Sequence, residues 1–403
     1  MTHRIRHATV LAVAGLLAAA TACTGQQSTP PGFAGRQLSE ERGVGGAGAG
    51  EADTARTFTL LASGDVLPHS SIIERAAADA GGRGYDFRPM LKGAAPLVSR
   101  ADLAICHMET VYAQDGGPYT GYPSFRSPSE VATALRATGF DSCSTASNHT
   151  LDDGAQGIGR TLDALDKAGV AHAGSARSVS EAGRTTVLKA GTGKKAAKVA
   201  HLAYTYGTND IPLPAGRPWA VNLIDRNRIL ADARAARREG ADVVVLSLHW
   251  GTEWQDAPDD TQLALGRELT ASTTAGRPDI DLVLGTHAHV PQAYEKVNGT
   301  WVVYGMGDQI AGAMINHEGV RDPRGNESSM GRFTFAPPAA AGERWKVTKA
   351  EFLPQWFDTE TGRVTALDAP HGDPTGRRRE IRDRISGVVL SRGAAQDGLV
   401  RGK

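Results

Sequence analysis

The stretch Asp281-Leu282-Val283-Leu284-Gly285-Thr286-His287-Ala288-His289 joins an apolar run to two histidines that are two positions apart. A short run of leucine and β-branched residues is typical of a buried strand, and the glycine allows the chain to turn where the strand ends. Two histidines at such a turn can direct two imidazoles into one small volume. Because imidazole is a common ligand of zinc, iron and other transition metals, the stretch predicts half of a metal site.

Four further apolar runs lead into residues that can also bind metal ions. The runs are residues 58–63, 101–106, 140–146 and 242–248, and they lead to Asp65, to Glu109, to Asn148 with His149, and to His249. In an open α/β sheet, ligands bind in the crevice at the carboxyl ends of the strands. Five strands that each end in Asp, Glu, Asn or His therefore predict one site at that edge.

Helical patterns separate these runs. The segments that begin at Ser129, Ile158 and Arg226 repeat apolar residues at helical spacing, and each stops at a glycine (Gly139, Gly169 and Gly240). Alternation of strand, helix and glycine stop predicts a layered α/β domain, which we assign to residues 56–340. Residues 332–335 and 346–353 are expected to be strands of a second sheet. Residues 341–403 are expected to hold C-terminal strands, a basic helix whose arginines face solvent, and a tail.

The motifs at the strand ends resemble those of the CapA family, the bacterial capsule or poly-γ-glutamate synthesis proteins. They are Gly64-Asp65-Val66, Ser147-Asn148-His149 with Asp152 and Gly154, Tyr204-Thr205-Tyr206-Gly207-Thr208-Asn209, His249-Trp250-Gly251-x-Glu253 and Gly285-x-His287-x-His289-Val290-x-Gln292. The resemblance covers roughly residues 57–335 in the family's order, which makes it more specific than one motif. It implies the layered α/β fold of the calcineurin-like metallophosphoesterases, in which helices sandwich two β-sheets.

The resemblance also implies a site for two divalent metal ions (Mn, Fe or Zn). The expected ligands are Asp65, Glu109, Asn148, His249, His287 and His289. Two-metal sites of this kind hold ions about 3.5–4 Å apart and lower the pKa of a water. Glu109 is expected to bridge the ions. His149 is expected to act as general acid or oxyanion stabiliser, with Asp152 as its orienting partner, and His69 is given no role.

Two positions depart from the family's pattern. His107 stands where the family usually has Asn. Tyr304-Gly305-Met306-Gly307-Asp308-Gln309 stands where the family commonly shows Tyr-Ser-Leu-Gly-Asn-Phe. Asp308 therefore adds a negative charge near the expected site, which would either strengthen metal binding or repel an anionic substrate.

The N-terminus predicts where the protein works. Arg4 and Arg6 precede an apolar run over residues 8–20, and small residues then lead to Cys23. This pattern predicts a lipoprotein signal peptide over residues 1–22 and a lipid on Cys23 that anchors the protein outside the cytoplasm. The alternative is a plain secreted protein in which Cys23 is incidental. Residues 23–55 are rich in Gly, Ser, Gln, Pro and Ala and are expected to be a flexible tether.

Cys106 and Cys143 have two interpretations that the sequence leaves open. Outside the cytoplasm a disulfide is permitted, and a bridge between these cysteines would brace two expected ligands, Glu109 and Asn148. Two buried free thiols are equally compatible with the sequence, since Cys is among the most buried residue types.

The balance of charged residues limits the classes of partner that the sequence indicates. The 403 residues carry 44 Lys+Arg and 44 Asp+Glu, so the charge balance gives no sign of a nucleic-acid partner. The expected function is metal-dependent hydrolysis of a phosphoester in capsule, poly-γ-glutamate or envelope metabolism. One alternative is a capsule-assembly protein that binds an anionic surface polymer without turnover. The other is amide hydrolysis or transfer on poly-γ-glutamate at the same metals.

Overall fold

The computed structural model describes residues 56–191, 196–340, 342–368, 373 and 375–403. The predicted signal peptide (1–22), the tether (23–55) and Cys23 lie outside the described residues. The described residues belong to one compact unit. Over the described part of the chain, no helix combines the length and the apolar character needed to cross a membrane.

The first sheet has nine strands and a parallel centre, in which β1, β2, β3 and β4 follow one another. Beyond β1 it continues through the antiparallel strands β14, β15 and β16, while β13 pairs with β1 and β17 with β15. Its strands are β1 Phe58–Val66, β2 Leu103–Met108, β3 Ser142–Ser144, β4 Ala171–Ala173, β13 Asp308–Ile310, β14 Glu327–Ala336, β15 Lys346–Asp358, β16 Arg363–Ala366 and β17 Leu399–Arg401.

The second sheet has six strands in the order β11-β12-β10-β7-β6-β5. Its strands are β5 Thr186–Ala190, β6 Ala197–Thr205, β7 Val243–His249, β10 Leu282–Thr286, β11 Tyr294–Val297 and β12 Thr300–Val303, and the separate two-stranded sheet is β8 Thr273–Thr274 with β9 Arg277–Pro278. All residues of β7 are buried, and its two neighbours run parallel to it. An unbroken apolar run is what a parallel strand covered on both faces requires.

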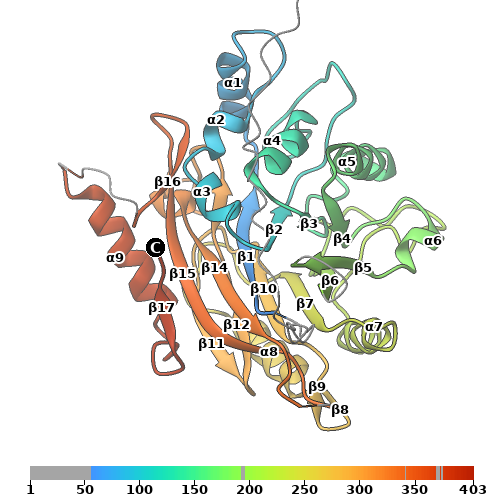
Figure 1. The fold of residues 1–403 in the computed structure, drawn as a ribbon. Coiled ribbons are helices and arrows are strands. Elements are labelled where there is room, and N and C mark those ends of the chain that lie inside the picture. The colour runs from blue at the N-terminus through green and yellow to red at the C-terminus, as the bar shows by residue number, and fades with distance from the viewer. Residues whose placement is uncertain (1–55, 192–195, 341, 369–372, 374) are drawn as a thin grey trace, which may run out of the picture. The chain divides into compact units, whose positions relative to one another are not determined.

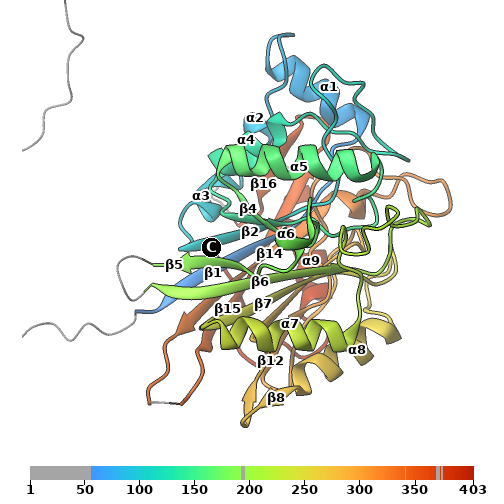
Figure 2. The same cartoon turned by 90° about the vertical axis from the view of Figure 1, so that its right-hand side faces the viewer.

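Helices cover the outer faces of both sheets, as Figure 2 shows with α4 and α5 on one side and α7 and α8 on the other. The helices are α1 Ser70–Asp79, α2 Arg88–Leu91, α3 Ala95–Val98, α4 Glu130–Thr138, α5 Gly154–Ala168, α6 Val179–Ala182, α7 Arg226–Arg238, α8 Asp260–Ala271 and α9 Arg377–Val389, with a 3₁₀ turn, η1, at Pro323–Asn326. The predicted glycine stops after α4 and α5 are confirmed: Gly139 and Gly169 take the left-handed conformation that ends a helix without a Cβ penalty.

The three largest of four apolar clusters among the described residues hold these layers together. Leu61, Ala104 and Cys106 face the helices α1 to α5, and the second sheet packs on α7 and α8 in the same way. Between the sheets, Phe58 and Leu60 pack in one cluster with residues of β6, β7 and β10. The predicted α/β class, with two sheets sandwiched by helices, is confirmed.

The distribution of the strands between the sheets differs from the prediction. Residues 332–335 and 346–353 do not start a second sheet, because β14 and β15 extend the first sheet beyond β1. Phe58 lies opposite Phe335 in that pairing, and their rings stack at 5.1 Å. The strands that deliver His249 and His287 instead form the second sheet. A run of apolar residues predicts that a strand is buried, but it carries no information about which strand pairs with it.

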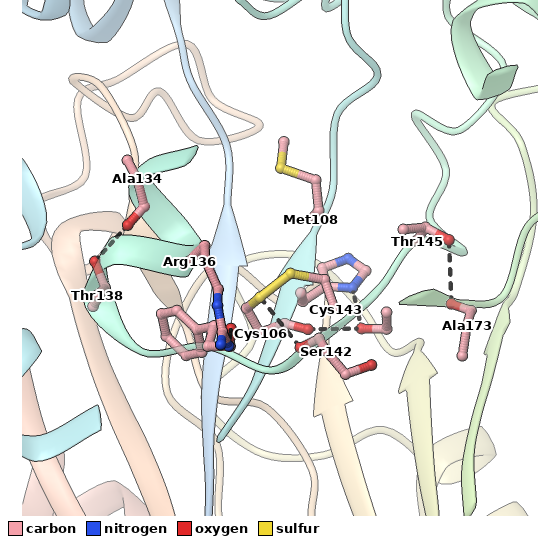
Figure 3. The surroundings of a disulfide bond; sticks show 12 residues. Cys106, Met108, Ala134, Arg136, Thr138, Ser142, Cys143, Thr145 and Ala173 are labelled. Atoms are coloured by element: carbon pink, nitrogen blue, oxygen red, sulfur yellow. Dashed lines mark hydrogen bonds between the residues drawn. A yellow bond between two sulfur atoms is a disulfide. The ribbon is translucent and has the colours of Figure 1, made fainter. Parts of the chain in front are cut away.

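A disulfide joins Cys106 on β2 to Cys143 on β3, and Figure 3 shows it at the centre of these two strands. The two cysteines are direct partners in the parallel register of β2 and β3. The structure therefore selects the bridge over the two free thiols. Glu109 follows β2 directly, and Asn148 lies four residues beyond β3, so the bridge fixes the spacing of the two strands that carry them.

Replacing Cys106 and Cys143 together by Ala is expected to destabilise the protein. The bridge spans 37 residues, for which the loss of loop entropy in the unfolded chain amounts to about 3–4 kcal/mol. Urea unfolding of the double variant beside the wild type measures the difference. The wild type in excess reductant is the control and should match the variant; a wild type that reductant leaves equally stable would contradict the bridge.

Candidate metal centre

The carboxyl end of β1 places Asp65 between two ligand-type side chains. In the register of the first sheet, Asp65 lies opposite His107 on β2 and opposite Asp308 on β13. The carboxylate of Asp65 is fully buried, and His107 Nε2 lies 3.8 Å from its Oδ1. Three strands of one sheet therefore bring two carboxylates and an imidazole to one point.

The second sheet contributes the remaining histidines from the ends of β7 and β10. His249 Nδ1 lies 3.1 Å from the hydroxyl of Thr286, its register partner. The backbone N–H of His287 donates to Asp65 Oδ2 at 3.1 Å, so a hydrogen bond joins the two sheets at the site. His289 Nδ1 lies 2.9 Å from Asp308 Oδ1 and 3.9 Å from Asp65 Oδ2.

The turn after β10 is built differently from the prediction that Gly285 makes it. Gly285 lies within the strand, and a Cβ there would stand 2.0 Å from the carbonyl oxygen of Tyr304, so the glycine permits a close approach of two backbones. The left-handed residues are His287, at φ 95°, and His289, at φ 58°. Non-glycine residues pay a steric cost in this region, which is typical of functional sites.

Glu109 and Asn148 complete the set from the loops after β2 and β3. Glu109 Oε1 lies 3.9 Å from His249 Nε2, and Asn148 Oδ1 lies 3.0 Å from the same nitrogen. The hydroxyl of Ser147 donates to the carbonyl of Glu109 at 2.5 Å, which ties the two loops together. The structure thus brings together all six side chains that the sequence predicts as ligands.

Many ligand atoms in this cluster are buried without a hydrogen-bond partner in the described part of the chain. They are Asp65 Oδ1, His107 Nε2, Glu109 Oε1 and Oε2, His287 Nδ1 and Asp308 Oδ2. A buried carboxylate oxygen without a donor costs free energy that a folded protein rarely leaves uncompensated. Carboxylate oxygens beside neutral imidazole nitrogens are the donor set of Mn, Fe and Zn sites, so these residues fit a metal centre.

Side chains from this cluster form three groups whose possible ligand atoms lie within 4.8 Å of one another. The groups are Asp65 with His107 and His249, Asp65 with His289 and Asp308, and Glu253 with His287 and His289. Asp65 belongs to two groups, and His289 also belongs to two. The arrangement is compatible with metal binding around a shared carboxylate.

The electrostatics of the metal-free cluster favour neutral groups except at His289, where burial opposes but the charges of Asp308 and Glu109 still raise the pKa well above its usual range. Burial, followed by the charge of Asp308, raises the pKa of Asp65 to about 8. Burial, followed by the charge of Asp65, also raises the pKa of Glu109 well above its usual range. Burial and neighbouring histidines hold the pKa values of His249 and His287 well below the usual range, which leaves these imidazoles neutral and able to bind a cation.

His149 and Asp152 lie beside the cluster in the predicted relation. His149 Nδ1 is 2.8 Å from Asp152 Oδ2, which also accepts from the backbone N–H of Phe125 at 2.6 Å. The ring of Phe125 meets that of His149 edge-on at 4.7 Å. The carboxylate and the aromatic ring together fix the orientation of the imidazole, while Nε2 has no hydrogen bond among the described residues.

Four residues of the site were not predicted as ligands. His107 and Asp308 were noted only as departures from the family, and the signal that identifies them is their register opposite Asp65. Glu253 joins His287 and His289, although the sequence showed it only as part of a motif. His69 is partly buried, and its buried Nε2 has no partner among the described residues; burial lowers its pKa to about 4, helped by the charges of His289 and His149.

Divalent cations are expected to stabilise the protein more strongly at pH 8 than at pH 6. The pKa of Asp65 lies at about 8 in the folded protein, against 3.8 for an unperturbed Asp side chain, so the proton on it stabilises the metal-free fold at low pH. This stability is lost as the pH rises towards 8, whereas a cation requires the deprotonated carboxylate. A cation at a hundredfold excess over its Kd adds about 2.7 kcal/mol.

The protein is first freed of metal with a chelator. Its thermal unfolding, with and without added Mn²⁺ or Zn²⁺, then measures this effect at both pH values. Asp65→Asn should remove most of the cation effect, and Asp260→Asn, at an exposed position on α8, is the matched control that should retain it. A cation-induced shift of the same size at pH 6 and pH 8 would refute the role given to the Asp65 carboxylate.

The chain is similar to known capsule proteins. The sequence profile of a family described as "Bacterial capsule synthesis protein PGA_cap" matches residues 59–313. The "PGA biosynthesis protein CapA" of Bacillus subtilis is 29% identical over 187 residues, which cover 45% of this chain and 45% of that protein. A "Probable polyglutamine synthesis accessory protein" of Mycobacterium tuberculosis is 27% identical over 216 residues, 52% of this chain and 55% of that protein. The chain spans about half the length of these relatives.

Solved structures with a related arrangement were also found. The calcineurin-like phosphoesterase YfkN of Bacillus subtilis matches with a TM-score of 0.43 and 12% identity, over 84% of this chain and 99% of that chain. The NAD nucleotidase of Haemophilus influenzae matches with a TM-score of 0.42 and 15% identity, over 82% of this chain and 62% of that chain. The family assignment depends on the sequence profile, which covers more than half of the chain: this protein belongs to the PGA_cap family of bacterial capsule synthesis proteins.

Proposed function

We propose that this protein is an extracytoplasmic metal-dependent hydrolase of phosphoesters that acts in capsule, poly-γ-glutamate or envelope metabolism. The observation that carries the proposal is the group of buried, unpartnered carboxylate oxygens and imidazole nitrogens around Asp65. Asp65, Glu109, Asn148, His249, His287 and His289 would hold two divalent cations, with His107, Asp308 and Glu253 within reach of the same positions. When bound, such cations activate a water and neutralise charge on a phosphate.

The protein's own groups supply the proton chemistry. The Asp152 carboxylate accepts from His149 Nδ1–H, which leaves Nε2 as the atom that can hold a proton beside the substrate. In hydrolysis, a bond forms between water oxygen and phosphorus while the bond to the leaving oxygen breaks. We assign to the His149 imidazolium the transfer of its Nε2 proton to that leaving oxygen, while the proton that the attacking water loses passes to solvent.

The location outside the cytoplasm is part of the proposal. It is supported by the Cys106–Cys143 disulfide, since stable disulfides persist in oxidising compartments and are rare in the cytosol. A lipid on Cys23 would then hold the protein at the outer side of the membrane. The surface polymer is proposed because of the family, and a phosphoester or the anionic polymer itself would be the substrate.

His149→Ala is expected to lower kcat for an aryl phosphodiester by about 10²–10⁴-fold while the bound metal stays unchanged. The side chain is one residue away from a proposed ligand but lies outside the metal groups, so proton transfer should be lost without metal loss. Metal analysis and steady-state kinetics, run in added Mn²⁺, Zn²⁺ or Fe²⁺, measure both. His172→Ala, at a histidine on β4 outside the site, is the matched control and should keep full activity.

Asp65→Ala and His287→Ala are expected to lose both bound metal and turnover in the same assays. Metal binding without any turnover in the wild type would move the assignment to polymer binding or to amide hydrolysis, which poly-γ-glutamate as substrate then tests. A wild type that takes up no metal after reconstitution would overturn the centre itself.

A further inference from the structure

A cleft remote from the metal centre separates the short helices α2 and α3 from the strands β15 and β16, which Figure 1 shows side by side. Its volume is about 840 Å³, within the range of small-molecule sites. The apolar lining is made by Pro89, Pro96, Leu97, Leu353, Pro354 and Ala366. Nothing in the proposed hydrolysis uses this cleft.

Prolines and a close backbone contact shape the walls of the cleft. Both short helices begin with a proline in the first turn, where the fixed φ of proline suits the helix. Gly93, between the helices, packs against β16 so closely that a Cβ would stand 2.0 Å from the carbonyl oxygen of Val364. The shape of the cleft is therefore set by backbone contacts as well as by side chains, so a ligand would meet a preformed site.

The rim of the cleft carries positive charge that the protein does not neutralise. Lys92 and Arg100 are exposed there, and neither has an ion pair within the described residues. Arg363 donates two hydrogen bonds to Asp79, Asp368 Oδ1 pairs with Arg401, and Lys403 adds a further positive side chain to the lining. An apolar interior beside two unpaired cations is complementary to an amphiphile with an anionic head.

The lining residues also contain two buried acceptor oxygens without a hydrogen-bond partner among the described residues, Asp368 Oδ2 and Gln355 Oε1. Gln355 on β15 is 1% exposed, and its Nε2–H donates to the carbonyl of Pro354 at 3.1 Å. Its Oε1 is buried without a donor among the described residues. A buried amide oxygen of this kind requires a hydroxyl or N–H group, which a bound molecule can supply.

We propose that this cleft binds a single-chain anionic lipid of the monoacylglycerol phosphate type. The acyl chain would fill the apolar cleft, the phosphate would lie at Lys92 and Arg100, and the glycerol hydroxyl would supply a donor for Gln355. The site is independent of the metal centre and of the proposed hydrolysis.

Isothermal titration calorimetry of the full-length protein with 1-palmitoyl-glycerol-3-phosphate, below its micelle concentration, tests the proposal. We expect one molecule to bind per chain. Monopalmitoylglycerol, which lacks the charge, should bind at least tenfold more weakly, and glycerol 3-phosphate, which lacks the chain, should not bind. A wild type that binds no monoacylglycerol phosphate, or that binds the neutral lipid equally well, would overturn the proposal.

Two variants locate the site. Lys92→Gln with Arg100→Gln should raise the Kd for the anionic lipid at least tenfold and leave the Kd for the neutral lipid unchanged, while Ala366→Phe should abolish binding of both. Lys167→Gln, which removes an exposed lysine on α5, is the matched control. Binding that neither variant alters would assign the lipid to another surface. Self-association that Ala366→Phe abolishes, without lipid binding, would assign the cleft to a second copy of the chain; either result contradicts the proposal.

Discussion

The structure depends on one electrostatic constraint: two buried carboxylates, Asp65 and Glu109, share a small volume with several imidazoles. Among the described residues, three of their four oxygens have no hydrogen-bond donor. Desolvation of such a cluster is costly, and like charges add to the cost. The protein reduces the repulsion only in part, through the backbone N–H of His287 on Asp65 and the contact of His289 with Asp308. The carboxylate oxygens that still have no donor among the described residues make this edge of the fold suited to bind cations.

Two sheets are needed to build that cluster. β1, β2 and β13 deliver groups from the first sheet, while β7 and β10 deliver histidines from the second, and the apolar core between the sheets sets their separation. The Cys106–Cys143 bridge acts on the same edge, because it joins the two strands whose loops carry Glu109 and Asn148. Fold stability and site geometry are therefore coupled through the same few strands.

The sequence predicted the strand ends, because buried strands and glycine-stopped helices leave local patterns, and the six residues it proposed as ligands lie together in the structure. It did not predict which strands share a sheet, and this is why β14 and β15 were assigned wrongly. His107 and Asp308 were missed as members of the site for the same reason: each acquires its role only by lying opposite Asp65 in the register. The sequence predicts a turn at Gly285, whereas in the structure its small size serves packing and the turn uses His287 and His289.

The close approach of backbones at the glycines has a consequence for how this protein can vary. A Cβ at Gly64 would stand 1.7 Å from the carbonyl oxygen of Gly307, and one at Gly285 would stand 2.0 Å from that of Tyr304. Neither obstacle is a side chain that can rotate away. A directed-evolution library aimed at new substrates should therefore keep both glycines fixed. It should diversify exposed residues beside the metal centre, such as Tyr206, whose ring lies 4.5 Å from that of His287.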